Sequence, residues 1–303
     1  MRQILGTLFS VLFLTAPSIS HAALRVVTTT QDLAALTEAV GGNQVTVESL
    51  TPGTRDPHFA VAKPSMIRKV FRADLLLIVG ADMEIGWLPP LLQSSRNSNT
   101  LPGNPGYLDL STTVPLLGKQ AVSVSRALGD VHAKGNPHYW LDPRNGVRMA
   151  QAIATRLGEL DPSHAVDYQR RFEHFAKAME VKQSEWRVRL AYLEGRPVIA
   201  YHKSFDYLAD FFGFRIVGEV EPKPGIAPSA ASLSRLITRI KQEQTRVLIM
   251  EPYYERRSAR YLSEQTGINV AVLPQSVGSA DDITTYFVLF DRIVEALEDA
   301  VGE

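Results

Sequence analysis

Short apolar runs alternate with amphipathic stretches along most of the chain. The apolar runs are rich in β-branched and aliphatic residues, which is typical of buried strands, and the stretches between them repeat apolar residues at helical spacing. Near the amino end this pattern predicts strands at residues 24–30, 45–51 and 74–80 and helices at 31–42 and 65–73. Strands that alternate with helices favour βαβ units, so we expect a parallel sheet flanked by helices.

The same alternation returns near the carboxyl end. Strands and helices are predicted in turn at residues 197–202, 203–213, 214–220, 229–244, 246–252, 255–267, 269–274 and 283–301. A second α/β lobe with its own parallel sheet is therefore expected.

A long helical region separates the two lobes. Asp142 has the character of an N-cap, and Pro143 suits the first position of a helix that runs to about Leu160. Residues 163–195 then predict a polar helix of about 30 residues, which is roughly 45 Å at 1.5 Å per residue. The expected fold is α/β, with two lobes joined by a long rigid backbone helix. The boundaries are an N-terminal lobe at 23–160, a linking helix at 161–195 and a C-terminal lobe at 196–303.

The amino terminus resembles a secretory signal peptide. Arg2 precedes an apolar stretch at residues 4–17, and the small residues Ser20 and Ala22 stand at the −3 and −1 positions of a cleavage site. We predict that residues 1–22 are removed on export to the periplasm; an N-terminal anchor helix is the alternative.

Composition excludes several classes of protein. Lysine plus arginine and aspartate plus glutamate both number 32, so no charge excess points to nucleic acid. The chain has no cysteine, which excludes disulfides, thiolate metal ligands and a lipid anchor on an N-terminal cysteine.

Histidine is the residue type with the most promising arrangement. Of the seven histidines, His21 would leave with the signal peptide, and His164 and His174 lie among charges on the long helix. His132 stands in a polar loop, where we expect surface exposure, with an accessory metal contact as the alternative. The remaining candidates for a ligand role are His58, His138 and His202.

These three histidines occupy loops or strand ends. His58 lies in RDPHF and His138 in NPHYWLDP, each directly after a proline, while His202 ends a predicted strand. Open α/β sheets bind ligands beyond the carboxyl ends of their strands. Three imidazoles suit zinc and leave a fourth position for an oxygen. Their separations in sequence provide no local ligand spacing, so ordinary packed loop histidines remain an alternative reading.

Five segments, taken in order, resemble one protein family. RDPHF, NPHYWLDP, AYHKSFDYL, EPKPGIAPSAASL and LIMEPYY are similar to the zinc- and manganese-binding solute-binding proteins of bacterial ABC importers (cluster 9 family, zinc-type). The resemblance implies a periplasmic, monomeric, non-enzymatic protein that delivers a divalent metal ion to an inner-membrane permease. It also implies that His58, His138 and His202 are the metal ligands.

One segment departs from the family pattern. The family commonly closes its site with an aspartate, whereas LPQSVG (273–278) has Gln275 there. The fourth position is therefore open among Gln275, Asp281, Asp282 and a water. Glu251, in LIMEPYY, is expected to serve structural hydrogen bonding of the last strand rather than coordination.

The three-histidine set favours zinc as the cargo. Manganese prefers oxygen ligands and stands lowest in the affinity order, so Mn²⁺ is the less favoured cargo, while copper(II) binds such ligands more tightly than zinc. A zinc-dependent hydrolase using the three histidines is the alternative function, but the chain contains no HExxH motif. A periplasmic adhesin or structural protein would share the fold, but the sequence has no feature specific to one.

Overall fold

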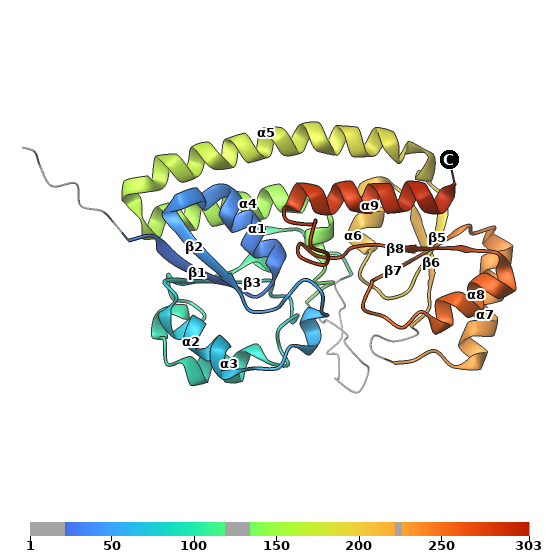
Figure 1. Ribbon diagram of the computed structural model, residues 1–303, viewed down its shortest axis with the longest axis horizontal. Coiled ribbons are helices and arrows are strands. Elements are labelled where there is room, and N and C mark those ends of the chain that lie inside the picture. The colour runs from blue at the N-terminus through green and yellow to red at the C-terminus, as the bar shows by residue number, and fades with distance from the viewer. Residues whose placement is uncertain (1–21, 119–133, 222–225, 303) are drawn as a thin grey trace, which may run out of the picture.

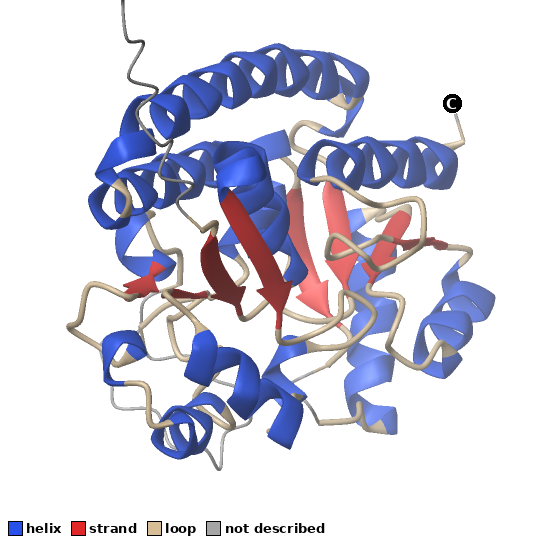
Figure 2. Ribbon diagram, turned by 60° about the vertical axis from the view of Figure 1, so that its left-hand side comes forward, coloured by secondary structure: helices blue, strands red, loops and turns tan. Residues whose placement is uncertain are grey.

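The computed structural model describes residues 22–118, 134–221 and 226–302. Each of its two lobes contains a four-stranded parallel sheet, and the sheets lie side by side (Figures 1 and 2). The first sheet has the order β2-β1-β3-β4, formed by β1 (Leu24–Thr28), β2 (Val45–Ser49), β3 (Leu75–Ile78) and β4 (Tyr107–Asp109). The second has the matching order β6-β5-β7-β8, formed by β5 (Pro197–Ala200), β6 (Arg215–Glu219), β7 (Val247–Met250) and β8 (Asn269–Val272).

Helices flank both sheets, as the alternating pattern predicts. The helices of the first lobe are α1 (Gln31–Gly41), α2 (Pro64–Arg72) and α3 (Leu88–Ser95). Those of the second lobe are α6 (Asp206–Phe212), α7 (Ala230–Glu243), α8 (Arg257–Thr266) and α9 (Tyr286–Val301). The expected α/β class with two parallel sheets is confirmed, whereas α3 and β4 were not predicted.

Two further helices connect the lobes. Helix α4 (Pro143–Leu160) begins at the predicted cap, where the Asp142 side chain accepts a hydrogen bond from the Arg144 backbone N–H. Helix α5 (Ala165–Arg189) runs above both lobes (Figure 1) and has 25 residues, about 37 Å. It is shorter than the predicted 163–195 because both of its flanks turn to 3₁₀ geometry.

A single group of buried apolar side chains extends through both lobes and the helices between them. Trp186 of α5 stacks on Phe290 of α9 with ring centroids 5.2 Å apart, and its Nε1 donates to Asp291 at 2.8 Å. The connecting helix is therefore packed into a shared core and is not an isolated rod.

Some sequence predictions lie outside the described residues. These are the signal peptide, apart from its last residue, and the loop residue His132. Within the described part of the chain, no helix has the length and apolar character needed to cross a membrane.

Candidate metal centre

The fold brings the three candidate histidines together. His58 lies in a 3₁₀ turn after β2, His138 precedes the turn that leads into α4, and His202 follows β5. Their ring centroids are 5.1 Å (His58–His138), 5.7 Å (His138–His202) and 6.3 Å (His58–His202) apart. All three side chains are buried, with exposed fractions of 9%, 2% and 3%. Residues 80 and 64 positions apart in sequence thus form one cluster between the lobes.

The three imidazole rings lie close together, but not all of them have the spacing that binding of one ion requires. Zinc–nitrogen bonds of about 2.0 Å in a tetrahedral site place the centroids of two ligating imidazoles roughly 5 Å apart. The His58–His138 pair meets this spacing, whereas the His58–His202 pair is about 1 Å too wide. Accordingly, among the described residues no three His, Cys, Asp or Glu side chains are already set to hold an ion. A shift of about 1 Å in these loop side chains would bring all three rings to the spacing of a tetrahedral site.

Two of the histidines share one local motif. In Asp56-Pro57-His58, the aspartate Oδ1 accepts from the backbone N–H of His58 at 2.9 Å and contacts its Nδ1 at 2.7 Å. In the Asn136 and His138 pair, the amide Oδ1 makes the same two contacts at 3.0 and 2.8 Å. The proline restricts the backbone between the two side chains, so the acceptor two residues before each histidine fixes its ring orientation.

The third histidine finds its acceptor far away in sequence. His202 Nδ1 lies 2.9 Å from Oε2 of Glu221, which follows β6. Burial lowers the pKa of His202, but the hydrogen bond to Glu221 and the charge of Glu251 outweigh it and raise that pKa above its ordinary value. With an oxygen acceptor at Nδ1 of every ring, the neutral imidazoles carry their proton on Nδ1 and their lone pair on Nε2.

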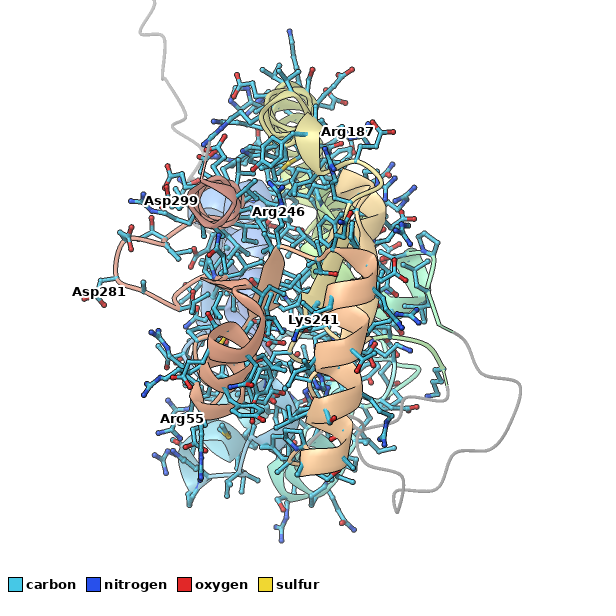
Figure 3. The ribbon with its side chains drawn as sticks, turned by 90° about the vertical axis from the view of Figure 1, so that its right-hand side faces the viewer. Arg55, Arg187, Lys241, Arg246, Asp281 and Asp299 are labelled. Atoms are coloured by element: carbon cyan, nitrogen blue, oxygen red, sulfur yellow. The ribbon has the colours of Figure 1, made fainter. Side chains whose placement is uncertain are left out.

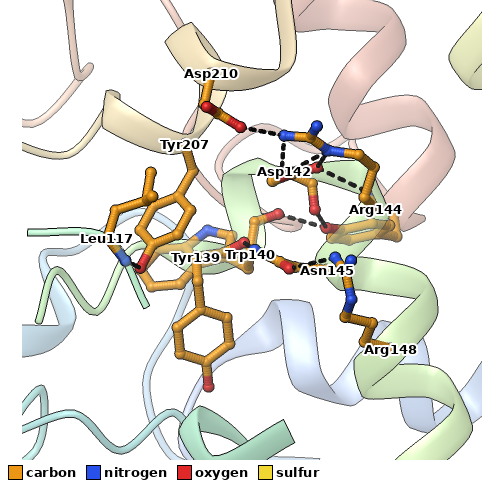
Figure 4. Close-up of polar contacts among 10 residues, drawn as sticks. Leu117, Tyr139, Trp140, Asp142, Arg144, Asn145, Arg148, Tyr207 and Asp210 are labelled. Atoms are coloured by element: carbon orange, nitrogen blue, oxygen red, sulfur yellow. Dashed lines mark hydrogen bonds and ion pairs between the residues drawn. The ribbon is translucent and has the colours of Figure 1, made fainter. Parts of the chain in front are cut away.

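The segment around His138 is fastened to both lobes. Tyr139 Oη donates to the Val79 carbonyl at 2.5 Å, and Trp140 Nε1 donates to the Gln275 carbonyl at 2.9 Å. At the start of α4, Arg144 bridges Asp142 and Asp210, a residue of α6 (Figure 4). These contacts hold the His138 backbone in place from both sides.

Gln275 is buried beside this cluster. Its exposed fraction is 2%, and its Oε1 accepts a hydrogen bond from Tyr253. Its Nε2 is buried without a hydrogen-bond partner among the described residues. Tyr253 adjoins Tyr254, whose ring lies 5.7 Å from that of His202. Gln275 is therefore linked to the histidine cluster through Tyr253 and Tyr254.

The two aspartates considered for the fourth position do not reach the cluster. Asp281 is exposed and points away from the molecule (Figure 3). Asp282 is also exposed and pairs with Arg292 at 2.7 Å. Neither aspartate side chain therefore lies in the buried cluster.

Glu251 lies on the same side of the second sheet as His202. It is fully buried, and its Oε1 accepts from Ser204, which follows β5, rather than from the last strand as expected. Burial raises the pKa of Glu251 to about 7, while His202 and Ser204 act in the opposite direction. Its Oε2 has no hydrogen-bond partner among the described residues.

The loop that carries Gln275 is attached to the first lobe. Asp32 of α1 accepts from Ser276 Oγ at 2.6 Å and from the Val277 backbone N–H at 2.9 Å. Gly53 also approaches this loop closely, since a Cβ there would lie 2.0 Å from the Val277 carbonyl oxygen. Burial raises the pKa of Asp32 to about 7, although both hydrogen bonds lower it. Sequence reasoning missed this contact between the lobes.

A family model described as zinc-uptake complex component A, periplasmic (ZnuA), matches residues 26–300. The chain belongs to the ZnuA family. Members of this family are substrate-binding proteins of metal ABC transporters and are not enzymes, so the hydrolase alternative is set aside.

Individual relatives of this ZnuA-family chain are distant. It is 28% identical over 167 residues to the high-affinity zinc uptake system protein ZnuA of Brucella suis, a match that covers 55% of this chain and 50% of that protein. The chain thus spans about half the length of that curated relative. It is 24% identical to an iron ABC transporter substrate-binding lipoprotein, MtsA, of Streptococcus pyogenes, covering 89% of this chain and 87% of that one.

A crystal structure of ZnuA shares the fold. Its TM-score is 0.75 at 24% identity, and the match covers 92% of this chain and 99% of that chain. The named relatives differ in the metal that their names carry, so family membership alone does not select the ion.

Proposed function

We propose that this protein captures zinc in the periplasm and delivers it to the permease of an inner-membrane ABC importer. Nε2 of His58, His138 and His202 would bind the ion. The observation that carries the proposal is the buried cluster of three imidazoles, each with an oxygen acceptor at Nδ1. Such outer partners fix the ring orientation and the tautomer of metal-binding histidines and raise their basicity. We further propose that residues 1–22 are a cleaved signal peptide and that the mature protein is a monomer.

Three nitrogen donors favour zinc over manganese. Imidazole suits zinc and its late first-row neighbours, whereas manganese prefers carboxylate, carbonyl and water oxygens. Copper(II) would bind this donor set more tightly than zinc, so selection against copper would depend on metal availability and geometry.

Metal content is the first test of this function. Protein purified from the periplasm is expected to contain about one zinc per chain, and competitive titration is expected to rank zinc above manganese. Binding of manganese in preference to zinc would overturn the choice of cargo. The absence of any stoichiometric divalent metal binding would overturn the function as a whole.

Gln275 is our candidate for the fourth position, and its substitution gives a second prediction. Gln275→Asp is expected to tighten zinc binding and to improve manganese binding by a larger factor, because a carboxylate offsets the charge of the ion and manganese favours oxygen donors. Gln275→Asn is the matched control, since it shortens the side chain equally without adding charge. Titrations of both variants with both metals provide the measurement. Weaker binding of both metals by Gln275→Asp would mean that this side chain does not face the ion.

A further inference from the structure

Each lobe carries a buried glutamate at the same place in its sheet. In the orders β2-β1-β3-β4 and β6-β5-β7-β8, the strand order reverses between β1 and β3 and between β5 and β7, because successive strands are added first on one side and then on the other. Open parallel sheets bind ligands in the crevice beyond the strand ends at such switch points. Glu84 occupies this crevice in the first lobe, and Glu251 occupies it in the second.

Both carboxylate oxygens of Glu84, the glutamate of the first lobe, accept hydrogen bonds within the protein. Its Oε1 accepts from Thr29 Oγ1 at 2.6 Å and from the Val79 backbone N–H at 2.8 Å. Its Oε2 accepts from the Gly80 backbone N–H at 3.0 Å. Both oxygens therefore serve to close the turn that follows β3.

Only one carboxylate oxygen of Glu251, the glutamate of the second lobe, accepts a hydrogen bond from the described residues. A single donor, Ser204, reaches Oε1, and Oε2 has no hydrogen-bond partner among the described residues. A buried carboxylate oxygen without a donor is costly unless a positive charge compensates it. The two lobes thus differ in whether this glutamate is satisfied by the fold alone.

Strand register places this unsatisfied carboxylate next to the histidine cluster. Ala200 of β5 pairs with Ile249 of β7, so His202 and Glu251 each stand two residues beyond a paired position. Beyond that pair, the Tyr201 N–H donates to the Ile249 carbonyl at 2.8 Å, so the two chains stay together. The two side chains therefore lie on the same face of neighbouring strands, at the same end of the sheet.

We propose that Glu251 is the anionic residue of the metal site, whose Oε2 faces the bound ion and sets its affinity. This inference rests on the proposed function. Three neutral imidazoles and a neutral Gln275 leave the two positive charges of the ion without a ligand of opposite charge. Asp56 and Glu221 each already direct an oxygen to a ring Nδ1. Glu251 supplies the negative charge that the family's usual aspartate would provide at position 275.

Glu251→Gln tests the inference with little change in shape. The variant is expected to bind zinc about ten- to a hundredfold more weakly, in the range seen for residues that support metal ligands. Glu251→Asp keeps the charge and is expected to bind zinc more tightly than Glu251→Gln does. Two controls are matched to it: Asp299→Asn removes an exposed negative charge, and Glu84→Gln alters the equivalent buried carboxylate. Asp299→Asn is expected to retain the parent's zinc affinity and stability, whereas Glu84→Gln is expected to lower only the melting temperature.

A double-mutant cycle with Gln275→Asp separates charge from structure. If Glu251 supplies the missing negative charge, Gln275→Asp improves zinc binding by a larger factor in the Glu251→Gln background than in the parent. Parent-like zinc affinity in Glu251→Gln, or equal factors in both backgrounds, would overturn the inference while leaving the proposed function intact. Failure of the parent protein to bind zinc would instead overturn the proposed function, and the inference with it. If Glu251→Gln does not fold, Glu251→Met, which also removes the charge at similar side-chain length, replaces it in the cycle, with the same expected and overturning results.

Discussion

Replacing His58, His138 and His202 together with alanine is expected to weaken zinc binding by at least about a thousandfold, because most of the binding free energy of a nitrogen-ligated zinc site comes from its protein ligands. Isothermal titration, or competition with a chelator of known affinity, provides the measurement. His174→Ala, on the exposed side of α5, is the matched control for loss of an imidazole and should bind zinc like the parent. Parent-like affinity in the triple variant would show that the ion binds elsewhere.

The same site should lose zinc as the pH falls. Zinc needs the neutral imidazole, whose unperturbed pKa is about 6.5. The pKa of His202 lies above that value, so protons compete for this ring at a higher pH than for an isolated histidine. Zinc affinity is therefore expected to begin falling above pH 6.5 and to fall steeply below it. An affinity that stays constant between pH 7.5 and 5.5 would contradict ligation by the three histidines.

Asp32→Ala is expected to destabilise the protein by roughly 2–4 kcal/mol, because it leaves the buried Val277 N–H and the Ser276 hydroxyl without their acceptor. Denaturant unfolding of the protein without added metal measures the change in the free energy of unfolding. Asp32→Asn keeps one acceptor oxygen and should lose less. A free energy of unfolding equal to that of the parent in Asp32→Ala would mean that the contact between α1 and residues 276–277 adds nothing to stability.

The pH dependence of this difference has a definite sign. Burial raises the pKa of Asp32 to about 7 in the folded protein, from 3.8. The folded state therefore holds a proton that the unfolded state has lost between these values. The contribution of this group to stability is fully present below about pH 4 and is lost as the pH rises through 7. The stability of the parent relative to Asp32→Asn should accordingly decrease over that interval.

Local signals account for most of the fold that the sequence predicted. Helix α4 begins as expected because Asp142 and Pro143 together mark its first turn. Strand β4 was missed because Tyr107–Asp109 is only three residues long, without an apolar run. Helix α3 was missed because Leu88–Ser95 is short and contains two prolines near its start.

Some residues of the site could be predicted from the sequence, and others could not. The Pro-His segments and the family resemblance identified the histidines, and the Asp56 and Asn136 acceptors are visible in hindsight as the polar residue before each proline. The acceptor for His202 depends on the pairing of β5 with β6, which a single sequence does not reveal. The bond between Asp32 and Ser276 spans 244 residues, so only the tertiary fold brings them together.

If the protein carries zinc as proposed, the core that runs from one lobe to the other limits how it can release the ion. Swinging the second lobe away from α5 would expose the Trp186–Phe290 stack, and each such aromatic ring buries roughly 150–250 Å². At about 25 cal/mol per Å², that motion costs several kcal/mol before any metal bond breaks. We therefore expect unloading to proceed by rearrangement of the loops that hold the rings. Release of the ion would then be driven by the importer and its nucleotide cycle. Between encounters with the importer, the ion would stay buried in the protein.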